Sequence, residues 1–177
     1  MSSLTDGATL SSGLLIARLV FGSLMVAHGT QKLFGWFGGY GLAGTGGFFD
    51  SLGFRPGKAF AAAASLTEIT GGLLLALGFL GPVGPALIIS VMIVAAISVH
   101  WKHGLFASTN GIELPLLYAA MALTIALTGP GLISLDAVLG LTSLWTPRVV
   151  LAAIAIGIVG GVANLALRRS VPQGVTV

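Results

Sequence analysis

Residues 69–98 read ITGGLLLALGFLGPVGPALIISVMIVAAIS, and this stretch decides the fold. It holds no charged side chain, and two apolar runs flank the segment Gly81-Pro82-Val83-Gly84-Pro85. Each proline removes a backbone donor and glycine permits turn dihedrals, so this segment predicts a tight break between two helices. Runs this apolar and this long are typical of transmembrane helices, so we expect an antiparallel hairpin that crosses a bilayer twice.

Three further apolar segments extend the pattern on either side of the hairpin. None of the segments alternates as the strands of a membrane barrel do, and hydrocarbon leaves helices as the way to satisfy backbone amides. No basic region and no small-residue cleavage site mark the first segment as a signal peptide, so we expect it to be retained. The sequence therefore predicts an all-α, polytopic transmembrane helix bundle with spans at residues 13–33, 58–80, 83–101, 112–128 and 147–167.

The composition agrees with a membrane protein and excludes several other classes. Of 177 residues, 55% are hydrophobic and 7% charged, with a mean hydropathy of +1.02, whereas soluble domains carry about a quarter charged residues. The eight Lys and Arg residues are scattered and form no continuous basic patch, which argues against a nucleic-acid partner. With no cysteine, the chain has no disulfide, no thiolate iron–sulfur cluster and no Cys-ligated zinc, so electron transfer needs a bound cofactor or a partner.

The basic residues indicate how the spans are oriented. With five spans, Arg148 is the lone basic residue on one face of the membrane. The N-terminus lies on the same face, and we expect this face to be outside the cell. By the positive-inside tendency, the other face is cytoplasmic and carries the C-terminus. The basic residues of the cytoplasmic face are Lys32, Arg55, Lys58, Lys102, Arg168 and Arg169.

The first connection, residues 34–57, mixes aromatic side chains with many glycines. Aromatic rings favour the headgroup level of a bilayer, so we expect a glycine-rich loop folded back onto the bundle. Residues 39–44, GYGLAG, formally match the dinucleotide-binding fingerprint. No predicted strand precedes them, which argues against that interpretation.

Two ionisable residues fall inside predicted spans, Arg18 and Glu68. A charge near the bilayer centre costs about 2.5–3.5 kcal/mol on insertion scales, so both side chains should face protein or water. Their estimated depths differ by roughly 7 Å at 1.5 Å rise per residue, a gap that a guanidinium can largely close. We therefore predict an interhelical Arg18–Glu68 pair, with a structural and a functional role both open.

A second polar cluster is expected near the cytoplasmic face, where several spans end. Histidines at such a level can hydrogen-bond a quinone carbonyl, pass a proton or ligate a metal or haem. Equally, Lys, His and Trp anchor helix ends at the interface, and a glutamate suits a helix N-terminus. Haem ligation by two of these histidines is feasible, but nothing in the spacing requires it, and no metal site is predicted. The cluster comprises His28, Lys32, His100, Lys102, His103 and Glu113.

Small residues recur on particular helix faces and predict close helix packing. Gly22 and Gly29 share a side with Arg18, and Gly71 and Gly72 share a side with Glu68. In the last span, Gly157 and Gly161 are four residues apart. This last pair is equally compatible with packing inside the bundle and with pairing to a second subunit.

Six motifs follow one another in a characteristic order and spacing: 17–19 (ARL), 28–34 (HGTQKLF), 53–54 (GF), Glu68 with 71–75 (GGLLL), 111–115 (GIELP) and 134–136 (SLD). Together they resemble the DoxX family of bacterial membrane proteins. The resemblance implies a four-helix core over residues 13–140, preceded by a short extracytoplasmic N-terminus at 1–12. A fifth transmembrane helix at 141–167 and a cytoplasmic tail at 168–177 look like additions. The family's motif points to Arg18, His28, Gly29, Lys32, Glu68, Glu113 and Asp136.

The resemblance implies a location in the bacterial inner membrane and a link to quinone or to oxidative-stress redox chemistry. The candidate residues for ligand binding or proton relay are Arg18, His28, Lys32, Glu68, His100 and Glu113. In that interpretation a quinone is the cofactor and a soluble or membrane enzyme is the redox partner. Two alternatives stay open: a non-catalytic anchor or scaffold for a soluble enzyme, and a small carrier or proton path. A homo-oligomer is compatible with each.

Overall fold

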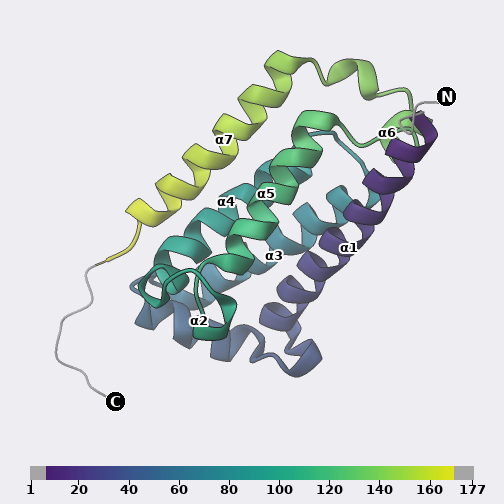
Figure 1. Ribbon diagram of the computed structural model, residues 1–177. Helices are drawn as coiled ribbons and strands as arrows, with labels where there is room; N and C mark the ends of the chain where they lie inside the picture. The colour runs from purple at the N-terminus through teal and green to yellow at the C-terminus, as the bar shows by residue number, and fades with distance from the viewer. Residues whose placement is uncertain (1–6, 170–177) are drawn as a thin grey trace.

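The computed structural model describes residues 7–169 and shows helices joined by short connections (Figure 1). The prediction of an all-α bundle is confirmed, since residues 7–169 contain no strand. The α-helices are α1 (Gly7–Phe34), α2 (Gly41–Ser51), α3 (Gly57–Leu77), α4 (Val83–Ala95), α5 (Glu113–Thr128), α6 (Leu135–Val138) and α7 (Pro147–Ala166). Shorter elements are η1 (Trp36–Gly38), η2 (Ala96–His100), η3 (Trp101–His103), η4 (Ala107–Thr109) and η5 (Thr142–Leu144); η2 is a π-helix.

The hairpin predicted from residues 69–98 is present as α3 and α4. Gly78 ends α3 in the left-handed region at φ 61°, and the amide of Phe79 donates to the carbonyl of Leu74 at 3.0 Å. Glycine suits this position because a Cβ is strained at positive φ. Pro82 immediately precedes α4, and the two helices pack against each other.

Among residues 7–169, four helical segments are long and apolar enough to cross a membrane: 7–34, 57–77, 83–103 and 147–166. The predicted fourth span corresponds to α5, which is shorter at 16 residues. Its two ends nevertheless line cavities at opposite ends of the bundle, Leu114 at one and Thr128 at the other. The chain is therefore a polytopic bundle, and α5 connects its two ends.

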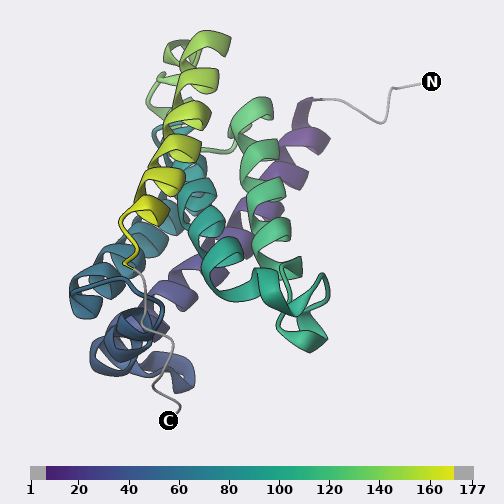
Figure 2. The same ribbon diagram turned by 90° about the vertical axis from the view of Figure 1, so that its left-hand side faces the viewer.

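The bundle has two distinct ends, seen in Figures 1 and 2. The hairpin end holds the start of α1, the α3–α4 turn and α6. The loop end holds the end of α1, α2, and the end of α7. Helix α1 thus begins at one end and α7 finishes at the other, as an odd number of crossings requires.

The helix boundaries differ from expectation at both termini. Helix α1 begins at Gly7, earlier than the predicted start at residue 13, so part of the expected N-terminal segment 1–12 is helical. Residues 1–6 of that segment lie outside the described residues. Of the tail predicted at 168–177, only residues 168 and 169 are described.

The connection 34–57 was predicted to be a loop, and this is wrong in part. It contains η1 and the three-turn helix α2, which packs against α3 and contacts α1. Helix propensity disfavours glycine, but close contact requires it here. A Cβ at Gly46 would lie 2.7 Å from Cγ of Lys58, so a larger residue would push α2 off α3.

Glycines also set the distances between the long helices. A Cβ at Gly22 would lie 2.7 Å from the carbonyl oxygen of Gly72, where α1 crosses α3. A Cβ at Gly71 would approach the carbonyl oxygen of Gly84 on α4 at 3.3 Å. In α7, a Cβ at Gly161 would lie 2.8 Å from the carbonyl oxygen of Ser90. The last span therefore packs on α4 within the chain, and its glycine pair is used there.

Candidate functional site

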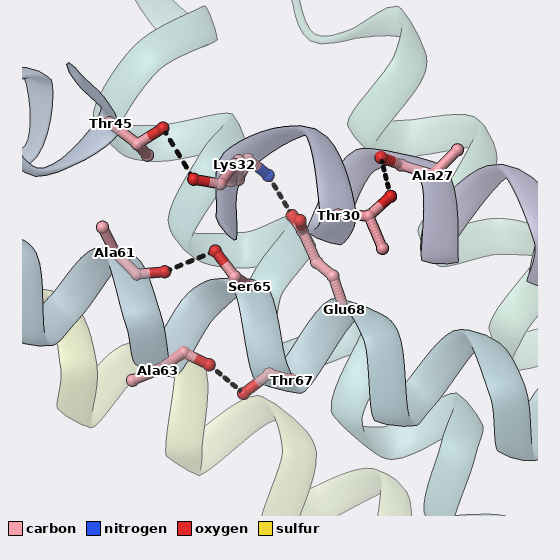
Figure 3. A network of polar contacts seen from close by, with 9 residues as sticks. All are labelled: Ala27, Thr30, Lys32, Thr45, Ala61, Ala63, Ser65, Thr67 and Glu68. Atoms are coloured by element: carbon pink, nitrogen blue, oxygen red, sulfur yellow. Dashed lines mark hydrogen bonds and ion pairs between the residues drawn. The ribbon is translucent and has the colours of Figure 1, made fainter. Parts of the chain in front are cut away.

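The site begins with Glu68, a carboxylate buried in the middle of α3. Its residue exposure is 1%, and Oε1 forms an ion pair with Nζ of Lys32 near the end of α1 (Figure 3). The Lys32 side chain is 32% exposed, so the pair lies between the core and the surface. The predicted Arg18–Glu68 pair is wrong, because Lys32 takes the position expected for Arg18.

Local sequence explains why Lys32 can reach a buried carboxylate. One turn before Lys32, a Cβ at Gly29 would lie 2.7 Å from the carbonyl oxygen of Ser65 on α3. The bare glycine lets the two backbones approach at this level. The hydroxyl of Thr45, on α2, donates to the carbonyl of Lys32 at 3.2 Å and ties α2 to the same turn (Figure 3).

The ion pair forms one wall of a pocket between four helical segments. The pocket has a volume of about 150 Å³. Three of the expected residues in the cytoplasmic cluster and Glu68 line it together, although they are far apart in the sequence. The lining residues are Met25, His28 and Lys32 from α1, Glu68 from α3, Met92, Ala95 and His100 from α4 and η2, and Leu114, Pro115 and Tyr118 from α5.

Tyr118 is the lining residue that sequence reasoning missed. Its ring is 7% exposed and meets the ring of His28 edge-on, with centroids 5.8 Å apart at 84°. The ring of Phe21 packs on the other side of Tyr118 at 5.6 Å. The signal was available, since Tyr118 is one of two tyrosines and stands inside an otherwise apolar run. Buried tyrosines are usually placed by a polar neighbour.

His100 ends the π-helical segment η2, where α4 departs from regular geometry. Such segments occur frequently at functional sites. Nδ1 of His100 lies 2.7 Å from the carbonyl oxygen of Asn110. A carbonyl only accepts, so Nδ1 carries the hydrogen, and Nε2 of the neutral ring is an acceptor.

Glu68 retains an unused acceptor. Among the described residues, its Oε2 atom is buried and has no hydrogen-bond partner. Buried polar atoms are nearly always paired, so such an atom calls for an explanation. A ligand donor in the neighbouring pocket would provide one.

The other members of the expected cytoplasmic cluster lie outside the pocket. Oε2 of Glu113 accepts from the amide of Ala107 at 2.7 Å and closes the connection before α5. His103 is exposed, and its Nδ1 lies 3.0 Å from the carbonyl oxygen of Val99. Lys102 is also exposed. These residues do not line the pocket that Glu68 and His100 share.

A wider cleft lies on the other side of Lys32, at the loop end. It has a volume of about 570 Å³ and is formed by the end of α1, η1 and α2. Gln31, Tyr40 and Phe48 are among its lining residues, and Lys32 lines it too. Lys32 thus lines both the inner pocket and a cleft with aromatic walls.

Arg18 belongs to a separate polar centre at the hairpin end. It is 1% exposed and donates through Nη2 to the carbonyl of Ile133. The carboxylate of Asp136, which is fully buried, interacts electrostatically with the Arg18 guanidinium. Asp136 accepts from the amides of Leu80 at 2.9 Å and Gly81 at 2.7 Å, and from Nε1 of Trp145 at 2.7 Å.

This second centre fixes the segment after α5 to the α3–α4 turn. Three donors satisfy the Asp136 carboxylate, so it stabilises the fold rather than facing a cavity. Gly78 lies directly beside Arg18, because a Cβ at this glycine would overlap the guanidinium. Arg18 therefore belongs to the polar centre at the hairpin end and not to the site around Glu68.

Comparison with known proteins places the chain in a family. No curated protein and no solved structure matches it. The family model described as DoxX matches residues 13–101, half of the chain. The matched part contains Arg18, His28, Lys32, Glu68 and His100, whereas α5, α6 and α7 lie beyond it. With its apolar, multi-pass helix bundle, this membrane protein belongs to the DoxX family.

Proposed function

We propose that the pocket between α1, α3, α4 and α5 binds the ring of a lipid-soluble redox molecule of the quinone class. The chain would then act as a small membrane subunit of a redox complex. The observation that carries this proposal is the buried, ion-paired Glu68 with one unpartnered oxygen beside a pocket. Burying such a carboxylate in a membrane bundle is costly and marks a functional site.

The size and chemistry of the pocket support a single ring. Drug-sized ligands occupy about 300–1,000 Å³, so a pocket of about 150 Å³ suits a headgroup with its tail outside. Lys32, His28 and His100 offer a cation and two imidazoles to ring oxygens. A porphyrin is much larger than one ring, so the pocket does not fit haem, although both histidines line it.

The electrons would come from a partner enzyme. The chain has no cysteine, and among residues 7–169 no group of three His, Asp or Glu side chains could hold a metal ion. A bound quinone would supply two-electron redox chemistry when present. The residues of the chain would bind and orient its ring and exclude water from it.

Gentle purification tests the proposal directly. The protein is isolated with native lipids, and bound small molecules are extracted and identified by mass spectrometry. We expect a quinone in the unaltered protein and its loss in Lys32→Met and His100→Ala. The matched controls are Lys102→Met and His103→Ala, which change the same residue types outside the pocket and should retain the ligand.

The result can also favour the anchor alternative. If no quinone is extracted and a stable enzyme partner keeps its activity with the Lys32→Met and His100→Ala variants, the pocket is not the working part of the molecule. The chain would then be a scaffold. Flux through proteoliposomes that Lys32→Met abolishes would instead indicate a carrier or proton path.

We further propose that the chain resides in the bacterial inner membrane with the loop end in the cytoplasm. Lys32, Arg55, Lys58, Lys102 and Arg168 lie at this end and Arg148 at the hairpin end, which supports that orientation. Since the chain lacks cysteine, single exposed reporters can be placed at either end as Ser108→Cys and Ser143→Cys. An impermeant maleimide added to intact cells should label only Ser143→Cys.

A further inference from the structure

We propose that the pocket prefers the reduced, hydroxyl-bearing form of its ring ligand, a hydroquinone, over the corresponding quinone. This inference rests on the proposed function and goes further, because it names the form of the ligand that the site takes. It follows from counting which polar atoms around the pocket still lack a partner.

The first acceptor is Oε2 of Glu68. Its partner atom Oε1 is already bound to Lys32, and Oε2 is buried without a hydrogen bond among the described residues. An ion-paired carboxylate has no hydrogen to donate. A quinone carbonyl facing this oxygen would bring two acceptors together, whereas a hydroxyl would donate to it.

The second acceptor comes from a different segment of the chain. His100 uses Nδ1 for the carbonyl of Asn110, so Nε2 of the neutral ring accepts. His100 lines the same pocket as Glu68. Two acceptors on one small pocket suit a ring that carries hydroxyl donors.

The donors around the pocket are Lys32, His28 and the hydroxyl of Tyr118. The ammonium of Lys32 has three hydrogens, one of which is directed at Glu68. His28 packs edge-on against Tyr118 and has an imidazole that can take either role. Lys32, His28 and Tyr118 can therefore meet a carbonyl, but such contacts leave the buried Oε2 atom of Glu68 unpaired. The unpaired Oε2 atom of Glu68 therefore favours the hydroquinone over the quinone.

The expected preference follows from one hydrogen bond to a charged group. Such bonds contribute enough to change an equilibrium constant by about 10-fold to 100-fold. We therefore expect the hydroquinone to bind at least about 10-fold more tightly than the quinone. A ring of the same shape without hydroxyl hydrogens should bind as weakly as the quinone.

The experiment compares three ligands on the full-length protein in detergent under anaerobic conditions. The ligands are 2,3-dimethyl-1,4-benzoquinone, its two-electron-reduced hydroquinone, and the dimethyl ether of that hydroquinone. Dissociation constants are measured by titration calorimetry with excess reductant present for the hydroquinone. This comparison uses the unaltered protein, so the result does not depend on any variant folding.

A pair of matched variants assigns the preference to one atom. Glu68→Gln replaces the buried acceptor with a group that also donates, so it should abolish most of the difference between hydroquinone and quinone. Glu113→Gln makes the same change outside the pocket and should leave the difference intact.

The outcomes separate this inference from the proposed function. If the quinone or the dimethyl ether binds as tightly as the hydroquinone, the inference is overturned while a ring-binding pocket stands. A preference that Glu68→Gln leaves unchanged also overturns it. If none of the three ligands binds, the proposed function fails and the inference with it.

Discussion

The crossing of α1 and α3 allows a quantitative test of the fold. In the structure, an ideal Cβ on Gly22 would lie 2.7 Å from the carbonyl oxygen of Gly72 and 2.8 Å from Cβ of Ala76. Real Cβ atoms essentially never show contacts below 3.0 Å. The oxygen belongs to the backbone and cannot rotate away, so Gly22→Ala must separate the two helices.

The expected cost of Gly22→Ala combines two opposing effects. Overpacking a tight contact destabilises proteins by about 1–3 kcal/mol. Replacing glycine with alanine inside a helix stabilises the helix by about 1 kcal/mol. We therefore expect a net loss of about 0–2 kcal/mol in the free energy of unfolding, which is about 1–3 kcal/mol less stable than the same substitution without the clash.

Gly13 provides a matched control in the same helix. No atom lies within 4 Å of an ideal Cβ at Gly13, so Gly13→Ala keeps the propensity gain without the clash. Its stability should be unchanged or higher by up to about 1 kcal/mol. Unfolding is followed by far-ultraviolet circular dichroism while sodium dodecyl sulfate displaces a mild detergent. Equal stabilities for Gly22→Ala and Gly13→Ala would refute the close crossing.

Three further predictions concern other contacts. Asp136→Asn replaces a buried carboxylate whose Oδ2 atom accepts from Gly81 and Trp145, so it should lower the free energy of unfolding by about 3–6 kcal/mol, at about 1.5–3 kcal/mol for each bond, measured by the same titration. Arg168→Ala removes the bond from Nε to the carbonyl of Leu52; because Arg168 is exposed, we expect a change below about 1 kcal/mol but faster hydrogen exchange at residues 52–54. Gly157→Ala should destabilise by up to about 2 kcal/mol and Gly160→Ala should not, because a Cβ at Gly157 would lie 2.5 Å from the carbonyl oxygen of Ala86, whereas a Cβ at Gly160 would meet the Ser90 hydroxyl at 3.4 Å; thermal unfolding distinguishes them.

The long helices could be predicted from the sequence because their apolar runs are uninterrupted. Helix α2 could not, because Gly41, Gly44, Gly46 and Gly47 all lower its intrinsic helix propensity. In the structure the contact with α3 outweighs that propensity. The sequence shows the glycines but not the partner surface that makes them favourable.

The polar contacts show the same limit. The estimate of depth from helix rise placed Arg18 and Glu68 roughly 7 Å apart, within reach of a guanidinium, but it could not include the segment after α5. That segment folds back and brings Ile133 and Asp136 to Arg18, leaving Glu68 to Lys32. Contacts that depend on how a connection folds are not encoded in the periodicity of the spans.

The gathering of His28, Lys32 and His100 was anticipated, since each ends a span on the same side. Tyr118 was not, because a tyrosine in an apolar run is as compatible with the core as with a site. The role of Glu113 in closing the connection before α5 also agrees with the simpler expectation for a residue at a helix start. The types of the polar residues and the end of the bundle at which they lie could be predicted from the sequence. The direction in which each side chain points could not.

The packing of α7 on α4 has a consequence for assembly. Helix α7 lies outside the family match, yet its glycines fit the strip of α4 around Ala86 and Ser90. In a bundle without such a helix, this strip would be open to lipid or to a separate protein. Here the covering helix is tethered to the same polypeptide, so its effective concentration is high whatever the dilution of the protein in the membrane. Helix α7 therefore occupies this strip of α4, and a helix from another protein would have to displace α7 to bind it.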